Sequence, residues 1–286
     1  MLKQDRLFDP DPYLKAIALD IYAAIKDTPI ISPHGHVDPA LFVDPNRRLP
    51  NPAELLIQPD HYVLRMLYSQ GITYEQLLIK DNPRQIWRLY AENADLFRGT
   101  PSGLWLADEL ETVFDVNEKL SAANADAVYD HIEKQLAQPT SSPRAMFERF
   151  NIAVLATTDS AIDTLEHHQA ICASGWNARI IPTFRPDTVV NLQTSGWRAN
   201  IDRLSQVSGI DVTDYASFIR ALEQRRQFFK SMGAKATDSG VLHPATDPLG
   251  VGDANRIFID ALRGEVTTAD AEAYMANMLY ELARMS

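Results

Sequence analysis

Hydrophobic residues near the start of the chain follow first a helical and then a strand-like pattern. Between Asp11 and Lys26 they recur every three or four residues, which predicts a helix with one apolar face. The segment TPIISPHGH, residues 28–36, is a short apolar run that ends in polar residues. This pattern is typical of a buried strand with functional groups at its carboxyl end.

Residues 38–143 have a different pattern, in which short amphipathic segments are separated by prolines and no convincing strand is present. The predicted helical segments are Asn51–Leu56, Asp60–Gln70, Tyr74–Leu78, Pro83–Phe97, Trp105–Phe114 and Asn124–Gln135. This stretch is far longer than one crossover helix requires. We therefore expect residues 38–143 to be a helical insertion after the first strand.

From residue 144 onward, apolar runs of strand length alternate with helical segments. The strands are predicted at Ile152–Thr157, Ala178–Phe184 and, less apolar, Gly233–Asp238. The helices are predicted at Ser160–Ala173, Trp197–Ser208, Asp214–Met232, Asp253–Leu262 and Thr268–Met285. This alternation predicts an α/β fold with a parallel sheet, either a (β/α) barrel or an open doubly wound sheet, formed by residues 1–37 and 144–286.

The number of strand–helix units bears on whether such a fold is complete. We count about four units, whereas a (β/α)8 barrel of the TIM type needs eight. The sequence also ends at Ser286 directly after a helical segment, where a further strand would be expected. We therefore expect an incomplete barrel.

Composition narrows the functional classes. The chain has 286 residues, 45% of them hydrophobic and 23% charged, and a formal net charge of −11. This acidic balance without a dense Lys/Arg run argues against a nucleic-acid partner, and no apolar stretch approaches the roughly 18 residues of a membrane span. The single cysteine, Cys172, favours a reducing, cytoplasmic location, and its helical context predicts a buried small side chain.

His34 and His36 are the clearest candidates for chemistry. Residues i and i+2 of a strand face the same side, so two imidazoles at this spacing can converge on one divalent cation. Gly35 between them allows close approach to the backbone, and active sites of barrels gather at strand ends. The alternative is that both histidines are polar residues at a strand end, with Pro33 and Asp38 forming a turn.

His61 and Tyr62 lie at the start of the helical segment that begins at Asp60. A histidine can shuttle protons at neutral pH, and a tyrosine can hydrogen-bond to a developing oxyanion. The simpler interpretation is that Asp60 caps the helix and His61 occupies its first turn. The local pattern alone favours this simpler interpretation.

Two polar residues follow the later predicted strands. Arg185 comes directly after ARIIPTF, where it can clamp a carboxylate with two parallel hydrogen bonds, although an ion pair with Asp187 explains it equally well. Asp238 ends the least apolar strand. It can bind a metal or orient a sugar hydroxyl, or it can be an ordinary loop residue.

Three further polar positions are expected to have structural roles. Asp159 directly precedes a predicted helix and is expected to cap it. His167 and His168 are neighbours within that helix, and adjacent helical side chains diverge. We therefore expect the two histidines to be structural or exposed rather than ligands.

Five separated segments resemble the uronate isomerase (glucuronate isomerase) family, an amidohydrolase-like family. In chain order they are PIISPHGHVDP, QPDHYVLRMLYSQGI, FRGTPSGLWLADEL, LATTDSAIDTLEHH and RIIPTFRPD. The resemblance extends from about Asp9 to the C-terminus, and five ordered motifs are far more specific than one His-x-His. It implies an amidohydrolase-like (β/α)8 barrel with a helical insertion after strand 1, which is the organisation predicted above.

The resemblance implies an aldose–ketose isomerisation in hexuronate catabolism. D-glucuronate would be converted to D-fructuronate, and D-galacturonate to D-tagaturonate. A proton leaves C2, a cis-enediol forms, and a proton is delivered to C1. The ligand would be a small hexuronate, with no nucleic-acid or membrane partner, and we expect a homo-oligomer.

The resemblance also assigns roles to individual residues. His34 and His36 match metal ligands of the family, and the expected cofactor is a divalent metal, zinc. The catalytic pair beside the sugar carbonyl is matched by His61 and Tyr62. The residues matched to substrate binding are Arg185, at the uronate carboxylate, and Asp238, an acidic residue after strand 4.

The family's chains are longer than this sequence, so we do not expect these residues alone to catalyse the reaction. They add a histidine after a later strand, and an arginine and a metal-binding aspartate after the last strand. That aspartate is a candidate for the base at C2. Two alternatives stay open: a non-catalytic homologue or fragment that binds a sugar acid, and a metal-dependent hydrolase on the same barrel, for which Lys235 is the lysine nearest a strand.

Overall fold

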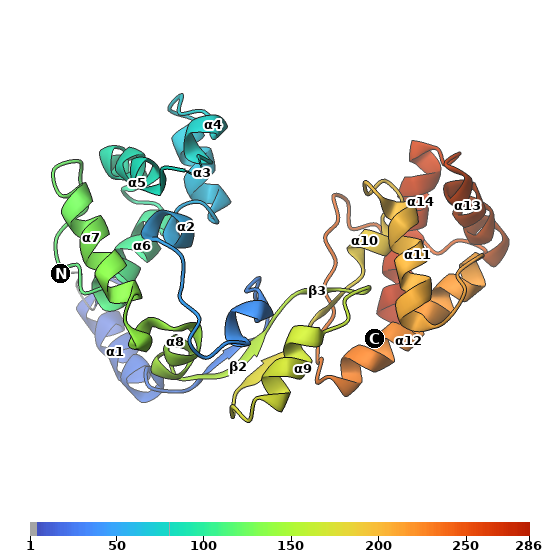
Figure 1. Ribbon diagram of the computed structural model, residues 1–286, viewed down its shortest axis with the longest axis horizontal. Coiled ribbons are helices and arrows are strands. Elements are labelled where there is room, and N and C mark those ends of the chain that lie inside the picture. The colour runs from blue at the N-terminus through green and yellow to red at the C-terminus, as the bar shows by residue number, and fades with distance from the viewer. Residues whose placement is uncertain (1–4, 80) are drawn as a thin grey trace. The chain divides into compact units, whose positions relative to one another are not determined.

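The computed structural model describes residues 5–79 and 81–286 and has an α/β fold (Figure 1). Two compact units divide the chain: Met1–Pro29 with Asp44–Asn151, here called the helical unit, and Ile30–Val43 with Ile152–Ser286, here called the strand unit. The predicted division was 1–37 with 144–286, against 38–143. In the structure residues 5–29 cluster with the helical segment.

The helical unit contains no strand among its described residues. Its helices are α1 (Pro12–Ile25), α2 (Pro52–Leu56), α3 (His61–Tyr68), α4 (Tyr74–Leu77), α5 (Pro83–Glu92), α6 (Pro101–Thr112), α7 (Ala125–Leu136) and α8 (Pro143–Arg149), with 3-10 turns η2 (Ala94–Phe97) and η3 (Pro139–Ser141). Five of these helices begin with proline directly after an Asp, Asn, Thr or Ser that caps the helix through its side chain. Proline has no N–H to lose at this position, which explains why prolines separate the predicted segments.

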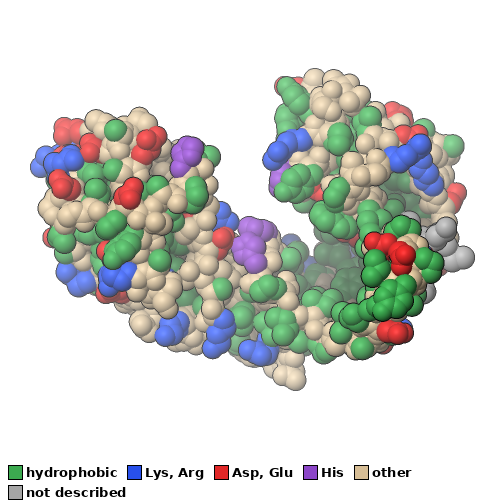
Figure 2. Space-filling model, turned by 180° about the vertical axis from the view of Figure 1, so that it is seen from behind, with side chains coloured by type: hydrophobic (Ala, Val, Ile, Leu, Met, Phe, Trp, Pro, Cys, Tyr) green, Lys and Arg blue, Asp and Glu red, His purple; other side chains and the backbone are tan. Residues whose placement is uncertain are grey.

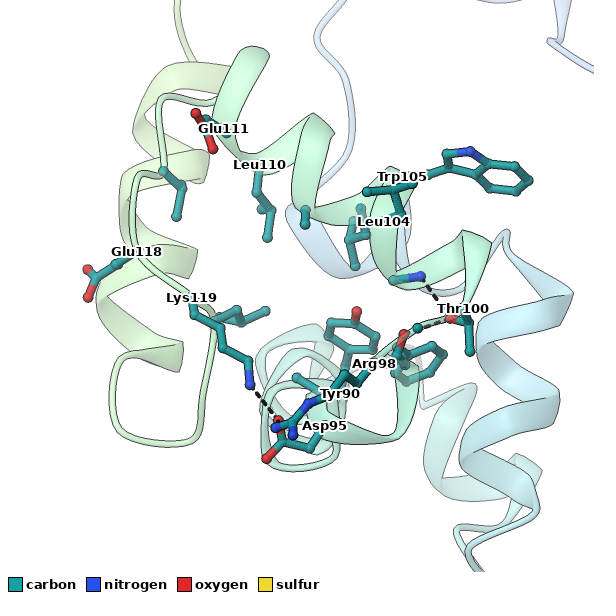
Figure 3. A pocket seen from close by; sticks show the side chains of 18 of the residues that line it. Tyr90, Asp95, Arg98, Thr100, Leu104, Trp105, Leu110, Glu111, Glu118 and Lys119 are labelled. Carbon is teal, nitrogen blue, oxygen red and sulfur yellow. Dashed lines mark hydrogen bonds and ion pairs between the residues drawn. The ribbon is translucent and has the colours of Figure 1, made fainter. Parts of the chain in front are cut away.

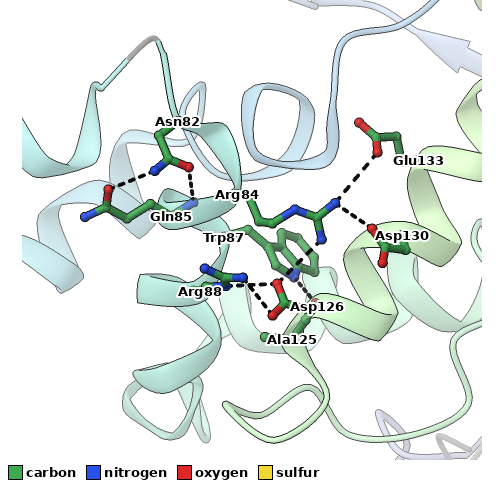
Figure 4. Close-up of polar contacts among 9 residues, drawn as sticks. All are labelled: Asn82, Arg84, Gln85, Trp87, Arg88, Ala125, Asp126, Asp130 and Glu133. Atoms are coloured by element: carbon green, nitrogen blue, oxygen red, sulfur yellow. Dashed lines mark hydrogen bonds and ion pairs between the residues drawn. The ribbon is translucent and has the colours of Figure 1, made fainter.

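Helices α5 and α7 pack against each other around a buried tryptophan (Figure 4). The side chain of Trp87 is fully buried, and its Nε1 donates a hydrogen bond of 2.9 Å to the carbonyl of Ala125. On the exposed side of the contact, Arg88 binds the Asp126 carboxylate through Nε and Nη2 at 2.9 and 2.8 Å. Exposed ion pairs contribute only about 0–1 kcal/mol each, so the buried indole carries more of this contact.

Parallel strands form the framework of the strand unit. Strands β1 (Ile30–Ser32), β2 (Ile152–Ala156) and β4 (Arg179–Ile181) pair in the order β1-β2-β4. Strands β3 (Asp159–Ser160) and β5 (Phe184–Arg185) form a second parallel pair, and Phe184 makes an isolated parallel bridge to Thr237. Because β3 follows β2 and β5 follows β4, neighbours in space follow the order of the chain, without the reversal of a doubly wound sheet.

Helices complete the strand unit and supply most of its core. They are η1 (Pro39–Phe42), α9 (Glu166–Ala173), α10 (Asp187–Val190), α11 (Trp197–Ser208), α12 (Tyr215–Ser231), α13 (Val251–Arg263) and α14 (Thr268–Arg284). Phe184 of β5 packs edge-on against Phe229 of α12, with ring centroids 5.1 Å apart. Phe258 of α13 contacts both Phe218 and Tyr274, so one aromatic cluster joins α12, α13 and α14.

Three predicted elements differ from those observed. The helix predicted from Ser160 begins at Glu166, because Asp159 and Ser160 belong to β3. The strand predicted over residues 178–184 is two short strands, β4 and β5. The strand predicted over residues 233–238 is reduced to the single bridge at Thr237.

One predicted burial is wrong, and one helix with an apolar face is not buried. Cys172 is exposed, not a buried small side chain. Helix α1 forms nearly where predicted, but none of its residues is buried, and its apolar side chains lie open to solvent; hydrophobic side chains exposed at the surface can be seen in Figure 2. In the described part of the chain, no helix combines the length and apolar character needed to cross a membrane.

Candidate functional site

Four of the predicted site residues gather at the carboxyl ends of the parallel strands. His34 and His36 follow β1, Arg185 ends β5, and Asp238 follows the bridge at Thr237. We call these four residues the strand-end cluster. Parallel strands bring their carboxyl ends to one edge of a sheet, which is why residues some 200 positions apart in sequence meet here.

The two histidines of the cluster face each other. Their Nε2 atoms are 3.1 Å apart, and the rings stand nearly perpendicular at an interplanar angle of 89°. Two nitrogen ligands of one tetrahedral zinc, each at about 2.0–2.1 Å from the metal, lie about 3.3 Å apart. Both side chains are exposed, and Figure 2 shows histidines at the molecular surface. The pair thus has the spacing of two ligands to one cation.

Gly35, between the two histidines, packs closely against the end of β2. A Cβ on Gly35 would come within 2.9 Å of the Ala156 carbonyl oxygen, a distance that side chains do not tolerate. The Gly35 carbonyl accepts a 2.8 Å hydrogen bond from Oγ1 of Thr158. Glycine is therefore required here for close approach of backbones, as the sequence predicts.

Arg185 is bound by two carboxylates. Its Nε donates to Asp187 at 2.6 Å, and its Nη1 lies 3.0 Å from Oδ2 of Asp238. The hydrogen bond to Asp187 raises the pKa of the guanidinium, so it stays protonated. The backbone N–H of Gly240 binds the Asp187 carboxylate at 3.0 Å, and a Cβ on Gly240 would come within 2.5 Å of the Arg185 guanidinium. The predicted ion pair with Asp187 is therefore present, and a second one joins it.

The charges of this region favour a cation beside His34. Asp187 and Asp238 carry two negative charges against the single positive charge of Arg185, and Oδ2 of Asp238 lies 3.9 Å from Nε2 of His34. Among residues 5–79 and 81–286, however, no group of three His, Cys, Asp or Glu side chains is arranged to hold a metal ion. The cluster therefore supplies two nitrogen ligands, with a carboxylate close by.

His61 and Tyr62 belong to the helical unit, at the first turn of α3. The Asp60 carboxylate caps this helix by accepting hydrogen bonds from the N–H groups of Tyr62 and Val63 at 2.8 and 3.2 Å. The capping interpretation of Asp60 is thus confirmed. The two rings lie side by side, with centroids 4.1 Å apart, and both are exposed. A cap of this kind leaves both side chains open to a ligand.

A buried polar group lies directly behind the strand-end cluster, and sequence reasoning missed it. Asp159, Thr157 and His168 are 6%, 0% and 2% exposed. The Thr157 hydroxyl lies 2.7 Å from the Asp159 carboxylate and 2.8 Å from Nε2 of His168. We expected Asp159 to cap α9, and this prediction is wrong: Asp159 lies in β3. The only sequence signal was the polar run TTDS at the end of an apolar strand.

A cavity lies elsewhere, in the helical unit (Figure 3). It has a volume of about 740 Å³ and lies between η2, α6 and residues 116–120. Tyr90 and Leu110 point into it, and Lys119 pairs with Asp95 at its edge. None of the predicted site residues lines it.

Lys235, the lysine that the metal-dependent hydrolase alternative would place near the metal, is exposed.

Comparison with known proteins gives one consistent result. A sequence profile of the glucuronate isomerase family matches residues 11–286. Uronate isomerases of Nostoc punctiforme and Brucella canis are 48% and 43% identical to the whole chain, which covers 62% of each relative. The crystal structure of glucuronate isomerase from Caulobacter crescentus matches with a TM-score of 0.95 and 41% identity over 100% of this chain and 61% of that one. Uronate isomerase from Thermotoga maritima matches with a TM-score of 0.90 and 26% identity over 100% of this chain and 62% of that one.

Proposed function

Because the chain belongs to the glucuronate isomerase family, we propose that it carries part of the active site of a uronate isomerase. The reaction is the interconversion of D-glucuronate and D-fructuronate, and of D-galacturonate and D-tagaturonate, through a cis-enediol. The chain spans about 62% of the length of the curated relatives. The observation that carries the proposal is the convergence of His34, His36, Arg185 and Asp238 at one set of strand ends.

Arg185 is proposed to hold the uronate carboxylate. A guanidinium has five N–H donors in a planar fork, and the described contacts with Asp187 and Asp238 leave some of them for a ligand. The same two carboxylates keep the fork in one orientation, which lowers the entropy lost when substrate binds. Asp238, beside both Arg185 and His34, is proposed to accept a hydrogen bond from a sugar hydroxyl.

His34 and His36 are proposed to supply two ligands of a divalent metal, with zinc as the candidate. The support is their Nε2 separation of 3.1 Å and the excess of carboxylates over cations nearby. When bound, such a metal stabilises negative charge on substrate oxygen. The rings of His61 and Tyr62 on α3, which contact each other, are proposed to move the protons of the sugar hydroxyl and carbonyl oxygens during ring opening and isomerisation.

We also propose that the strand unit is part of a (β/α)8 barrel. All its described strand pairs are parallel, and neighbours in space follow the chain order from β1 to the bridge at Thr237. An open doubly wound sheet would reverse that order at a switch point. We also propose a cytoplasmic location, which the single cysteine supports. We propose that the protein is a homo-oligomer, and sedimentation of the purified protein tests this.

The proposed activity is tested by completing the chain. A chimera joins this chain to the segment of the Nostoc punctiforme relative that it does not cover. Ketose formation from D-glucuronate and D-galacturonate is measured for the chain and for the chimera. Replacing both ligands, His34→Asn with His36→Asn, is expected to lower kcat/KM of the chimera by about 100-fold or more.

A matched control distinguishes loss of the site from loss of any histidine. His243 is exposed and lies outside the strand-end cluster. The variant His243→Asn should keep the kcat/KM of the unchanged chimera. A chimera that folds and binds zinc but forms no ketose from either uronate would refute the proposed function.

A further inference from the structure

The buried residues behind the strand-end cluster form one connected network. The Thr157 hydroxyl has a single proton, and its short contacts are with the Asp159 carboxylate at 2.7 Å and with Nε2 of His168 at 2.8 Å. A carboxylate accepts, so Thr157 donates to Asp159 and His168 donates to Thr157. Nδ1 of His168 is buried without a hydrogen-bond partner, which fits a neutral ring with its proton on Nε2. The network therefore has one direction of donation, from His168 to Asp159.

Asp159 joins this network to the strand that carries Arg185. Its Oδ2 also lies 3.3 Å from the N–H of Thr183, and its own N–H donates to the Thr183 carbonyl at 3.0 Å. Thr183 directly precedes β5, where Arg185 lies. The buried carboxylate thus binds the backbone at the point where β4 passes into β5.

Thr158, between Thr157 and Asp159, contacts the segment that carries His34 and His36. Both of its neighbours are held by buried hydrogen bonds, so the backbone of Thr158 has little freedom. Its Oγ1 donates 2.8 Å to the carbonyl of Gly35, the residue between His34 and His36. The segment that carries the imidazoles is therefore attached to the end of β2 by one hydrogen bond and by the close approach of Gly35 to Ala156.

We propose that Thr158 and Asp159 are positioning residues of the site. Thr158 sets the facing geometry of His34 and His36 through Gly35, and Asp159 fixes both Thr158 and the start of β5 that carries Arg185. Neither residue needs to contact substrate or metal. The proposal rests on the proposed function, because it assigns both residues to the same site. It also makes a claim about ring geometry that holds without any metal.

The test compares isosteric variants of the 286-residue chain. Thr158→Val removes the hydroxyl that binds Gly35, Thr158→Ser keeps it, and Asp159→Asn removes the buried charge. Ser160→Ala is the matched control, because the Ser160 hydroxyl instead contacts Oγ1 of Thr188 at 2.9 Å. Two quantities are measured: the affinity and visible absorption spectrum of bound Co²⁺, and the proton–proton NOE between the two imidazole rings without metal.

Thr158→Val and Asp159→Asn are expected to weaken Co²⁺ binding by about 10-fold or more, as loss of groups that orient metal ligands commonly does. Their spectra should shift, and the NOE between the rings should fall. Thr158→Ser and Ser160→Ala should match the unchanged chain. Thr158→Val, which replaces a partly buried side chain of equal size, keeps the test informative if Asp159→Asn fails to fold.

The two readouts separate this proposal from the proposed function. If the unchanged chain, whose strand-end cluster supplies only two nitrogen ligands, binds no Co²⁺, the NOE alone decides: a loss in Thr158→Val with retention in Thr158→Ser supports the positioning role. If Thr158→Val leaves the NOE unchanged, the positioning role is refuted while the proposed function stands. Where the unchanged chain binds Co²⁺, refutation also requires that Thr158→Val leave the Co²⁺ affinity unchanged.

Discussion

His168 is the residue whose burial has the clearest consequence for stability. Its ring is 2% exposed, and burial lowers its pKa below the ordinary value of 6.5, against the opposing effects of Asp159 and Asp163. Below about pH 6.5 the unfolded chain therefore binds a proton that the folded chain resists. His168 should thus lower the free energy of unfolding as the pH falls from about 6.5 toward its lowered pKa.

The variant His168→Asn tests this sign. Its stability deficit relative to the unchanged chain should be largest near pH 7.5 and should shrink near about pH 5, as measured by urea unfolding. His167→Asn, in which the neighbouring and more exposed histidine is replaced, is the matched control. A deficit of His168→Asn that stays constant across this range would mean that His168 is not held neutral.

The sequence predicts that His34 and His36 face the same side, and their Nε2 atoms are 3.1 Å apart. The reason given by the sequence, the two-residue period of a strand, does not hold, because β1 ends at Ser32 and both histidines follow it. The roles of Asp159 and His168 could not be predicted in this way. Their burial depends on Thr157 and on contacts between different strands, which no local pattern records.

Helix α6 offers a test at the scale of elements, because it packs closely on η2. A Cβ on Gly103 would lie 2.2 Å from the carbonyl oxygen of Phe97, which is backbone and cannot move aside. Gly103→Ala should therefore lower the free energy of unfolding of the helical unit by about 1–3 kcal/mol. The general gain of alanine over glycine in a helix is smaller than this penalty.

A glycine in another helix should give the opposite sign. A Cβ on Gly252, near the start of α13, would meet nothing within 4 Å. Gly252→Ala should therefore raise the free energy of unfolding of the strand unit by up to about 1 kcal/mol. Urea unfolding of both variants checks the pair. Equal effects of the two substitutions would show that the α6–η2 contact is looser than described.

Helices of the chain are predictable from sequence more fully than its strands. The periodic segments that became α11, α12 and α14 have clear apolar faces, and they form within one or two residues of the predicted ends. The two-residue strands β3 and β5 carry no apolar run of their own. They exist because parallel pairing continues beyond β2 and β4, which only the assembled sheet determines.

The chain belongs to one family and folds into two units, one helical and one with parallel strands. The order of motifs identifies the family, and the sequence also predicts an α/β fold with a helical insertion. The clustering of residues 5–29 with the helical segment was not predictable, because the apolar face of α1 alone does not specify its neighbours. No residue of α1 is buried, although the helix has an apolar face. An amphipathic pattern therefore does not by itself establish burial.

The most direct test of the account is metal-dependent ketose formation by the chimera of this chain and the Nostoc punctiforme segment. D-glucuronate is incubated with the chimera after chelation of metals and again after zinc is restored, and D-fructuronate is measured. We predict a large loss on chelation, recovery with zinc, and no recovery in the variant that lacks both His34 and His36. Full activity after chelation, or the same recovery without the two histidines, would contradict the assignment of the strand-end cluster as the metal-binding part of the site.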